Sequence, residues 1–229
     1  MNKAKIKGKW LCLTEETNAL DYLEQACCYI CQTEKNTTAW KWVILALNGA
    51  LYGFLICAVR GTSNDSVLKW KELKGKHKIN FTGPVFDDGY VLIKKSADGN
   101  HQFIRTDRLI GFDDALALCQ DPRKMKMFTF SKHLQLSNQQ KESIKKLRKE
   151  FRNNFEHYVP KNWVIEIHGM PQIAIDVLEV IRFLVLDAGN CVHLTQEQKA
   201  KIEGMILQGK QILGESQLYK ESELVNSHQ

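Results

Sequence analysis

Apolar side chains recur at every third or fourth position over most of this chain, which is the spacing of amphipathic helices. Five segments show this spacing; they cover residues 14–35, 39–60 and 137–158 and begin near 171 and 195. Capping residues support them, because Thr14 precedes the first segment, and Ser137 with Gln140 has the spacing of a capping box. Short connections between such helices favour an antiparallel helical bundle. The predicted fold class is therefore all-α, or mainly so.

The helical spacing is lost between residues 62 and 136, where Gly, Asp, Asn and Lys become frequent. We interpret this stretch as an insertion into a single domain, residues 1–229. Within it, Tyr90–Lys95 and His101–Arg105 flank an Asp-Gly-Asn turn, a pattern that predicts a small β-hairpin. A short helix is expected to follow from about Phe112 to Gln120.

The second predicted helix is apolar from Val43 to Val59 except for Asn48, and this pattern has two interpretations. The segment is at the short limit for a membrane span, and Lys41 and Arg60 close its ends. Because it is the one such segment in the sequence, we favour a buried central helix. Small residues on one side allow another helix, from this chain or a second copy, to approach closely. They are Ala46, Gly49, Ala50, Gly53 and Cys57.

The charge and the two ends of the chain narrow the class of protein only a little. Lys and Arg number 32 against 26 Asp and Glu, and the net charge of +6 indicates a mild preference for polyanions. The lysine-rich N-terminus is not followed by a secretory signal, so a cytoplasmic location is expected. The polar segment 217–229 is expected to be a flexible tail.

The seven cysteines are scattered and odd in number, which argues against a disulfide framework and for reduced, mostly buried thiols. Cys28 and Cys31 have the spacing of half a zinc site but have no second ligand pair nearby. Buried structural cysteines are the favoured interpretation of this pair. Neither a metal nor another cofactor is expected.

A polar group on the third predicted helix suits the cleavage of RNA. At about 100° per residue, Arg152, Asn153 and His157 lie away from the apolar side of that helix. Attack by the 2′-hydroxyl of the RNA needs a base, an acid and positive charge at the phosphate. Imidazole titrates near neutral pH and guanidinium is a permanently charged fork, so His and Arg meet these needs without a metal. In the structural alternative, Arg152 pairs with Glu156, and the helix C-terminus favours a charged His157.

Residues 152–157, Arg-Asn-Asn-Phe-Glu-His, match the Arg-Asn-x-x-x-His form of the HEPN signature. Further runs resemble a branch of HEPN proteins found on bacterial chromosomes and plasmids, and the likeness covers roughly residues 14–60 and 105–190. The resemblance implies a helical bundle of HEPN type, often dimeric, and in many members a metal-independent ribonuclease of toxin, antiphage or RNA-processing systems. It assigns catalytic roles to Arg152 and His157, with Asn153 as the residue that positions them.

The resemblance also implies partners, namely RNA, a second copy in a homodimer, and an antitoxin or regulatory protein. One toxin subgroup carries a tyrosine two residues after the histidine, where its partner modifies it. Val159 stands at that position, so this regulation is not expected here. Since some HEPN proteins have lost activity, the alternative function is an inactive module that binds RNA or a protein. A membrane-associated protein that uses residues 43–59 is a third possibility.

A basic run in the insertion also has two interpretations. Its members are Lys69, Trp70, Lys71, Lys74 and Lys76. Such a run either contacts RNA phosphates and stacks on a base, or forms a solvated basic loop.

Overall fold

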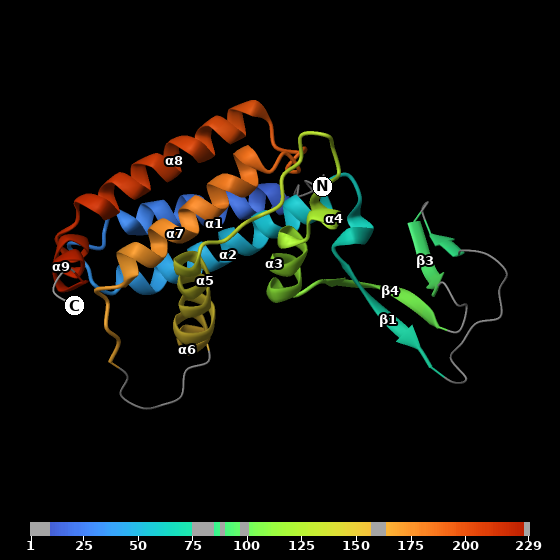
Figure 1. Ribbon diagram of the computed structural model, residues 1–229, viewed down its shortest axis with the longest axis horizontal. Helices are drawn as coiled ribbons and strands as arrows, with labels where there is room; N and C mark the ends of the chain where they lie inside the picture. The colour runs from blue at the N-terminus through green and yellow to red at the C-terminus, as the bar shows by residue number, and fades with distance from the viewer. Residues whose placement is uncertain (1–9, 75–84, 88–89, 97–100, 157–163, 227–229) are drawn as a thin grey trace, which may run out of the picture.

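The computed structural model describes residues 10–74, 85–87, 90–96, 101–156 and 164–226, and this part of the chain is mainly helical (Figure 1). The principal helices are α1 (Glu15–Ile30), α2 (Ala39–Arg60), α3 (Phe112–Gln120), α5 (Asn138–Lys145), α7 (Met170–Arg182) and α8 (Gln196–Glu215). The shorter helices are α4 (Pro122–Met125), α6 (Asn153–Glu156) and α9 (Gln217–Asn226). Two π-helical segments, Lys146–Arg152 and Phe183–Asp187, continue α5 and α7. The predicted mainly helical fold is confirmed.

Four helices, α1, α2, α7 and α8, form the central bundle. Helix α1 packs against α2 and α8, and α7 packs against the same two helices, which closes the ring. Helices α1 and α2 run in opposite directions, as do α7 and α8 (Figure 1). All four helices contribute fully buried side chains, among them Leu23, Leu47, Leu178 and Ile206. Each such side chain stabilises the fold by about 1.5–3 kcal/mol relative to an exposed one, so this core is the rigid support for α5.

Helix α2 lies at the centre of the bundle. It is long and apolar enough to cross a membrane, and it is the one such helix in the part of the chain that the structure describes. Nevertheless, 72% of its most apolar window is buried inside the molecule. Its neighbours include α1, α3, α7 and the segment Lys146–Arg152. The sequence pattern therefore corresponds to a buried central helix, as we favoured.

The small residues of α2 allow α1 to approach closely. A Cβ atom added at Gly53 would lie 2.6 Å from the Cβ atom of Ala19, and one at Gly49 would lie 2.7 Å from the ring of Tyr22. Both distances are too short for real carbon atoms. The close helix partner predicted from these residues is thus α1 of the same chain.

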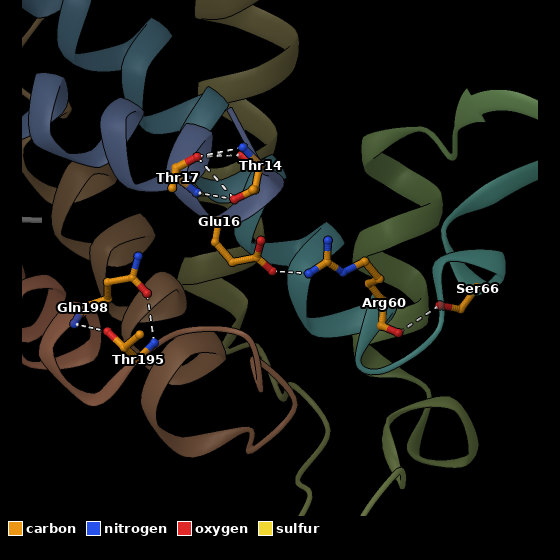
Figure 2. A network of polar contacts seen from close by, with 7 residues as sticks. All are labelled: Thr14, Glu16, Thr17, Arg60, Ser66, Thr195 and Gln198. Carbon is orange, nitrogen blue, oxygen red and sulfur yellow. Dashed lines mark hydrogen bonds and ion pairs between the residues drawn. The ribbon is translucent and has the colours of Figure 1, made fainter. Parts of the chain in front are cut away.

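Polar caps fix the ends of these helices (Figure 2). Thr14 caps α1 in a reciprocal pair with Thr17. Thr195 caps α8, where the Gln198 amide donates to the Thr195 hydroxyl at 3.1 Å and the Thr195 amide donates back to Gln198 at 2.9 Å. Each cap satisfies backbone groups that a helix end leaves without partners.

A largely buried ion pair joins the start of α1 to the end of α2, where Glu16 contacts Arg60 (Figure 2). The two side chains are 8% and 15% exposed, respectively. Helix α2 then ends at Gly61, whose positive φ of 50° suits glycine. The chain turns there with help from Ser66, whose hydroxyl donates to the Val59 carbonyl at 2.9 Å. These contacts fix the point at which the insertion leaves the bundle.

The insertion forms a four-stranded antiparallel sheet in the order β1-β4-β3-β2, drawn beside the bundle in Figure 1. The strands are β1 (Leu68–Leu73), β2 (Val85–Asp87), β3 (Tyr90–Lys95) and β4 (Gln102–Leu109). The predicted hairpin is confirmed as β3 and β4, although its turn lies outside the described residues. The interpretation of the basic run as a loop was wrong for Lys69, Trp70 and Lys71, which lie in β1, because β4 offers β1 a pairing partner that the sequence of β1 alone does not reveal.

The helix that carries the candidate site is held to the core by a buried carboxylate. Asp176 of α7 accepts hydrogen bonds from the Ser143 hydroxyl at 2.5 Å, from Gln172 at 2.9 Å and from Gln139 at 3.4 Å. Ser143 and Gln139 belong to α5, so these bonds fix the position of α5 along α7. A buried carboxylate needs such donors, because leaving it unpaired is costly.

The C-terminal segment differs from the expected flexible tail. Helix α8 ends at Glu215, and α9 follows from Gln217 to Asn226. The Tyr219 amide donates to the hydroxyl of buried Ser216, which begins the new helix, and α9 packs against α7 and α8. This docking on the bundle explains how a polar segment stays helical.

Candidate active site

Arg152 is the last residue of a π-helical segment between α5 and α6. In this segment the backbone hydrogen bonds span five residues, and the Asn153 amide donates to the Arg148 carbonyl. Fully buried Leu147 anchors the segment to the core, and Phe151 packs at the edge of the core. Short π-helical insertions are frequent at functional sites, since they reposition the side chains that follow.

Two neighbouring side chains hold the Arg152 guanidinium. Its Nη2 atom lies 2.5 Å from Oε2 of Glu156, and Nη1 donates to Oδ1 of Asn153 at 3.2 Å. Its Nε atom is buried and has no hydrogen-bond partner among the described residues. The Arg152 side chain is 33% exposed. A guanidinium has five N–H donors, so the group retains donors for an additional anion.

Only part of the predicted catalytic group can be placed. The structure brings Arg152 and Asn153 together, and Asn153 is exposed. His157 lies outside the described residues. The pair between Arg152 and Glu156 is the one that the structural alternative predicts. Glu156 is therefore a further member of the site, and its i,i+4 spacing from Arg152 was the signal for it.

The basic run in the insertion does not join this group. Lys69 and Lys71 are exposed on β1. Lys74 follows the strand, and its Nζ atom lies 3.6 Å from Oε2 of Glu72. Trp70 is partly buried and stands opposite Arg105 of β4. Lys76 lies outside the described residues. The sheet and α6 are well separated in Figure 1, so the lysines of β1 and Arg152 belong to different surfaces.

The cysteines divide into two groups. Cys12, Cys28 and Cys31 are exposed, so the expectation of a buried Cys28 and Cys31 pair was wrong. Both residues stand at the end of α1, on its solvent side. Cys57, Cys119 and Cys191 are buried, and burial raises the pKa of all three thiols, that of Cys191 to about 12. These three stay protonated near neutral pH, which excludes them as nucleophiles.

The described residues do not have the geometry of a metal site or of a phosphate-binding loop. Among the described residues, no group of three His, Cys, Asp or Glu side chains is arranged to hold a metal ion. Gly204, Gly209 and Lys210 have the spacing of a phosphate-binding loop, but all three lie inside α8. Lys210 pairs there with Glu179 of α7. The spacing is thus part of a helix–helix contact.

Comparison of the chain with protein-family models, with curated proteins and with solved structures gave no match. The likeness to HEPN proteins therefore depends on the sequence alone, namely on the motif at residues 152–157 and the runs that resemble the family.

Proposed function

We propose that this protein is a metal-independent endoribonuclease of HEPN type. The observation that carries the proposal is the position of Arg152, at the partly exposed end of a basic helix. Asn153 and Glu156 hold its guanidinium, within the Arg-Asn-x-x-x-His spacing. In this proposal Arg152 stabilises charge on the phosphate, Asn153 orients Arg152, and His157 transfers protons.

The reaction consists of one displacement at phosphorus. The 2′-hydroxyl oxygen forms a bond to phosphorus as its proton passes to a base. The bond to the 5′-oxygen breaks as that oxygen takes a proton from an acid, which leaves a 2′,3′-cyclic phosphate. The two non-bridging oxygens carry the developing charge, and the planar guanidinium suits them as a bidentate donor. His157 acts as the base or the acid.

A homodimer completes this chemistry more readily than one chain. One His157 side chain is available in each chain, whereas the displacement uses a base and an acid at the same time. A two-fold axis beside α6 would bring two copies of His157 and Arg152 to one cleft. An antitoxin or other regulatory protein that covers this cleft would inhibit the enzyme.

The alternative function is an inactive module that binds RNA or a protein through the same face. The ion pair between Arg152 and Glu156 favours it, because a neutralised guanidinium attracts a phosphate less strongly. Incubation of the purified protein with a mixed pool of structured and single-stranded RNA in excess chelator distinguishes the two functions. Cleavage supports the ribonuclease, whereas binding without cleavage supports the module.

Glu156 is expected to compete with RNA phosphate for Arg152. Replacing it by Gln in a His157→Ala background, which preserves the RNA, should tighten RNA binding about 3-fold, the range of an exposed ion pair. Fluorescence anisotropy with a labelled single-stranded RNA measures this effect. Glu150→Gln is the matched control, since Glu150 is exposed on the same helix and no ion pair joins it to Arg152 in the described structure. Weaker binding by Glu156→Gln, or equal tightening by Glu150→Gln, would contradict the expectation.

A further inference from the structure

A shallow groove of about 280 Å³ separates α3 from the long helix that leads to Arg152. Its floor is apolar and consists of Leu116 of α3, Ile144 of α5 and Leu136, which precedes α5. Its rim is basic on the α5 side, where Lys141, Lys145, Arg148 and Lys149 stand. An apolar floor between cations is a surface for a ligand that has both a flat apolar part and negative charge.

The charges on the rim are only partly compensated. Of the residues that line the groove, four are cations and Asp113 is the one carboxylate, so their net charge is 4 − 1 = +3. Arg148 forms an ion pair with Asp113. The Nζ atom of Lys145 lies 3.2 Å from Oε2 of Glu142. Lys141 and Lys149 are exposed and form no ion pair within the described residues.

A second groove, on another face of the same helix, lacks the positive charge of the groove beside α3. It has a volume of about 430 Å³ and lies between the helix and residues 164–173. Its charged lining residues are Lys146, Glu150 and Glu166, with a net charge of 1 − 2 = −1. A polyanion would therefore choose the groove beside α3.

The basic rim runs along the helix towards Arg152, which does not itself line the groove. Lys141, Lys145, Arg148 and Lys149 recur with helical spacing, and Arg152 follows four residues after Arg148. An α-helix of this length would rise about 16 Å from residue 141 to 152. The strip is somewhat shorter because residues 146–152 are π-helical, and it is still long enough to contact more than one phosphate. Arg148 is held in place by the ring of Phe112 as well as by Asp113. Its guanidinium carbon lies 4.3 Å from the centre of the Phe112 ring, which holds the guanidinium plane in position.

We propose that this groove, bounded by α3 and the Lys141–Lys149 face, binds single-stranded RNA and directs it towards Arg152. The inference rests on the proposed function, because it supplies the substrate path for that site. The rim lysines contact phosphates, and the apolar floor receives a base. A paired base cannot reach such a floor, since its faces are stacked within the duplex, and unpaired RNA is accordingly the preferred form.

The test is binding of a 5′-labelled, single-stranded 12-nucleotide RNA by fluorescence anisotropy in excess chelator, in a His157→Ala background. Lys141→Gln with Lys149→Gln should raise Kd at least about 10-fold at low salt and reduce the slope of log Kd against log salt by about 1.4, the value for two phosphate contacts. Lys124→Gln with Lys126→Gln is the matched control, because both lysines are exposed and lie outside the groove. It should change Kd less than about 2-fold.

Several outcomes would overturn the inference. They are unchanged binding by the groove variant, equal weakening by the control, weakening by Lys69→Gln with Lys71→Gln instead, and absence of RNA binding at low salt. Displacement of the RNA by polyglutamate at equal charge would identify an acidic protein as the better partner and would also overturn it. Circular dichroism checks that each variant is folded.

The experiments distinguish a failure of the groove proposal from a failure of the proposed ribonuclease function. If wild-type protein cuts RNA while the groove variant binds and cuts normally, the ribonuclease stands and the groove does not. If the groove variant binds weakly while wild-type protein never cuts, the groove stands and the ribonuclease does not.

Discussion

Replacing His157 by alanine is expected to slow RNA cleavage about 10³-fold, within the range that general acid–base groups contribute. The 2′-hydroxyl is a weak acid and the 5′-oxygen is a poor leaving group, so loss of proton transfer raises the barrier directly. Initial rates of cleavage of a labelled RNA in excess chelator measure the effect. RNA binding should change little, because the groove lysines and Arg152 remain in place.

His133→Ala is the matched control for this variant. His133 hydrogen-bonds to Gln135 ahead of α5 and lies outside the candidate site, so its removal should leave the rate nearly unchanged. Thermal unfolding of both variants separates a catalytic loss from a folding defect. Cleavage by folded His157→Ala at the wild-type rate would remove His157 from the mechanism.

The second large effect is expected in the contact between α1 and α2. Gly53→Ala should lower the free energy of unfolding by about 2 kcal/mol, because the new methyl group would lie 2.6 Å from the Cβ atom of Ala19 and force the helices apart. Gly204→Ala is the matched control, since nothing lies within 4 Å of a Cβ atom at this exposed position in α8. It should raise the free energy of unfolding by about 1 kcal/mol through helix propensity.

Urea unfolding measures the free energy of unfolding of the two variants, which should differ by about 3 kcal/mol. Equal stability of both would show that α1 and α2 are not packed at Gly53.

The bundle was predictable because local signals coincide with its boundaries. Thr14 caps α1 at its predicted start. Helix α2 ends at its predicted last residue, Arg60, because Gly61 follows with a positive φ. The pair Thr195 and Gln198 likewise begins α8. Each signal involves residues within one turn of the helix end, so no knowledge of distant packing was needed.

Features that depend on distant partners were not predictable in this way. Strand β1 alternates Lys with other residues and becomes a strand through pairing with β4. The π-helical segment that ends at Arg152 packs against α2, and its sequence is equally suited to an α-helix. Helix α9 needs its contacts with α7 and α8. In each case packing between distant residues decides the local structure.

The candidate site was predictable in part. The Arg152 guanidinium donates to Asn153, and it forms an ion pair with Glu156, four positions later. The basic groove was not predicted, because one of its walls, α3, belongs to the insertion. The helical spacing of Lys141, Lys145, Arg148 and Lys149 was the available signal.

The most direct test of the central claim is the chemistry of the RNA ends that the wild-type protein produces in excess chelator. Mass spectrometry of the products identifies the ends. The proposed mechanism predicts 2′,3′-cyclic phosphate on the upstream fragment and 5′-hydroxyl on the downstream fragment, because the 2′-oxygen is the nucleophile. Fragments with 3′-hydroxyl and 5′-phosphate ends, or the absence of any cleavage, would contradict it.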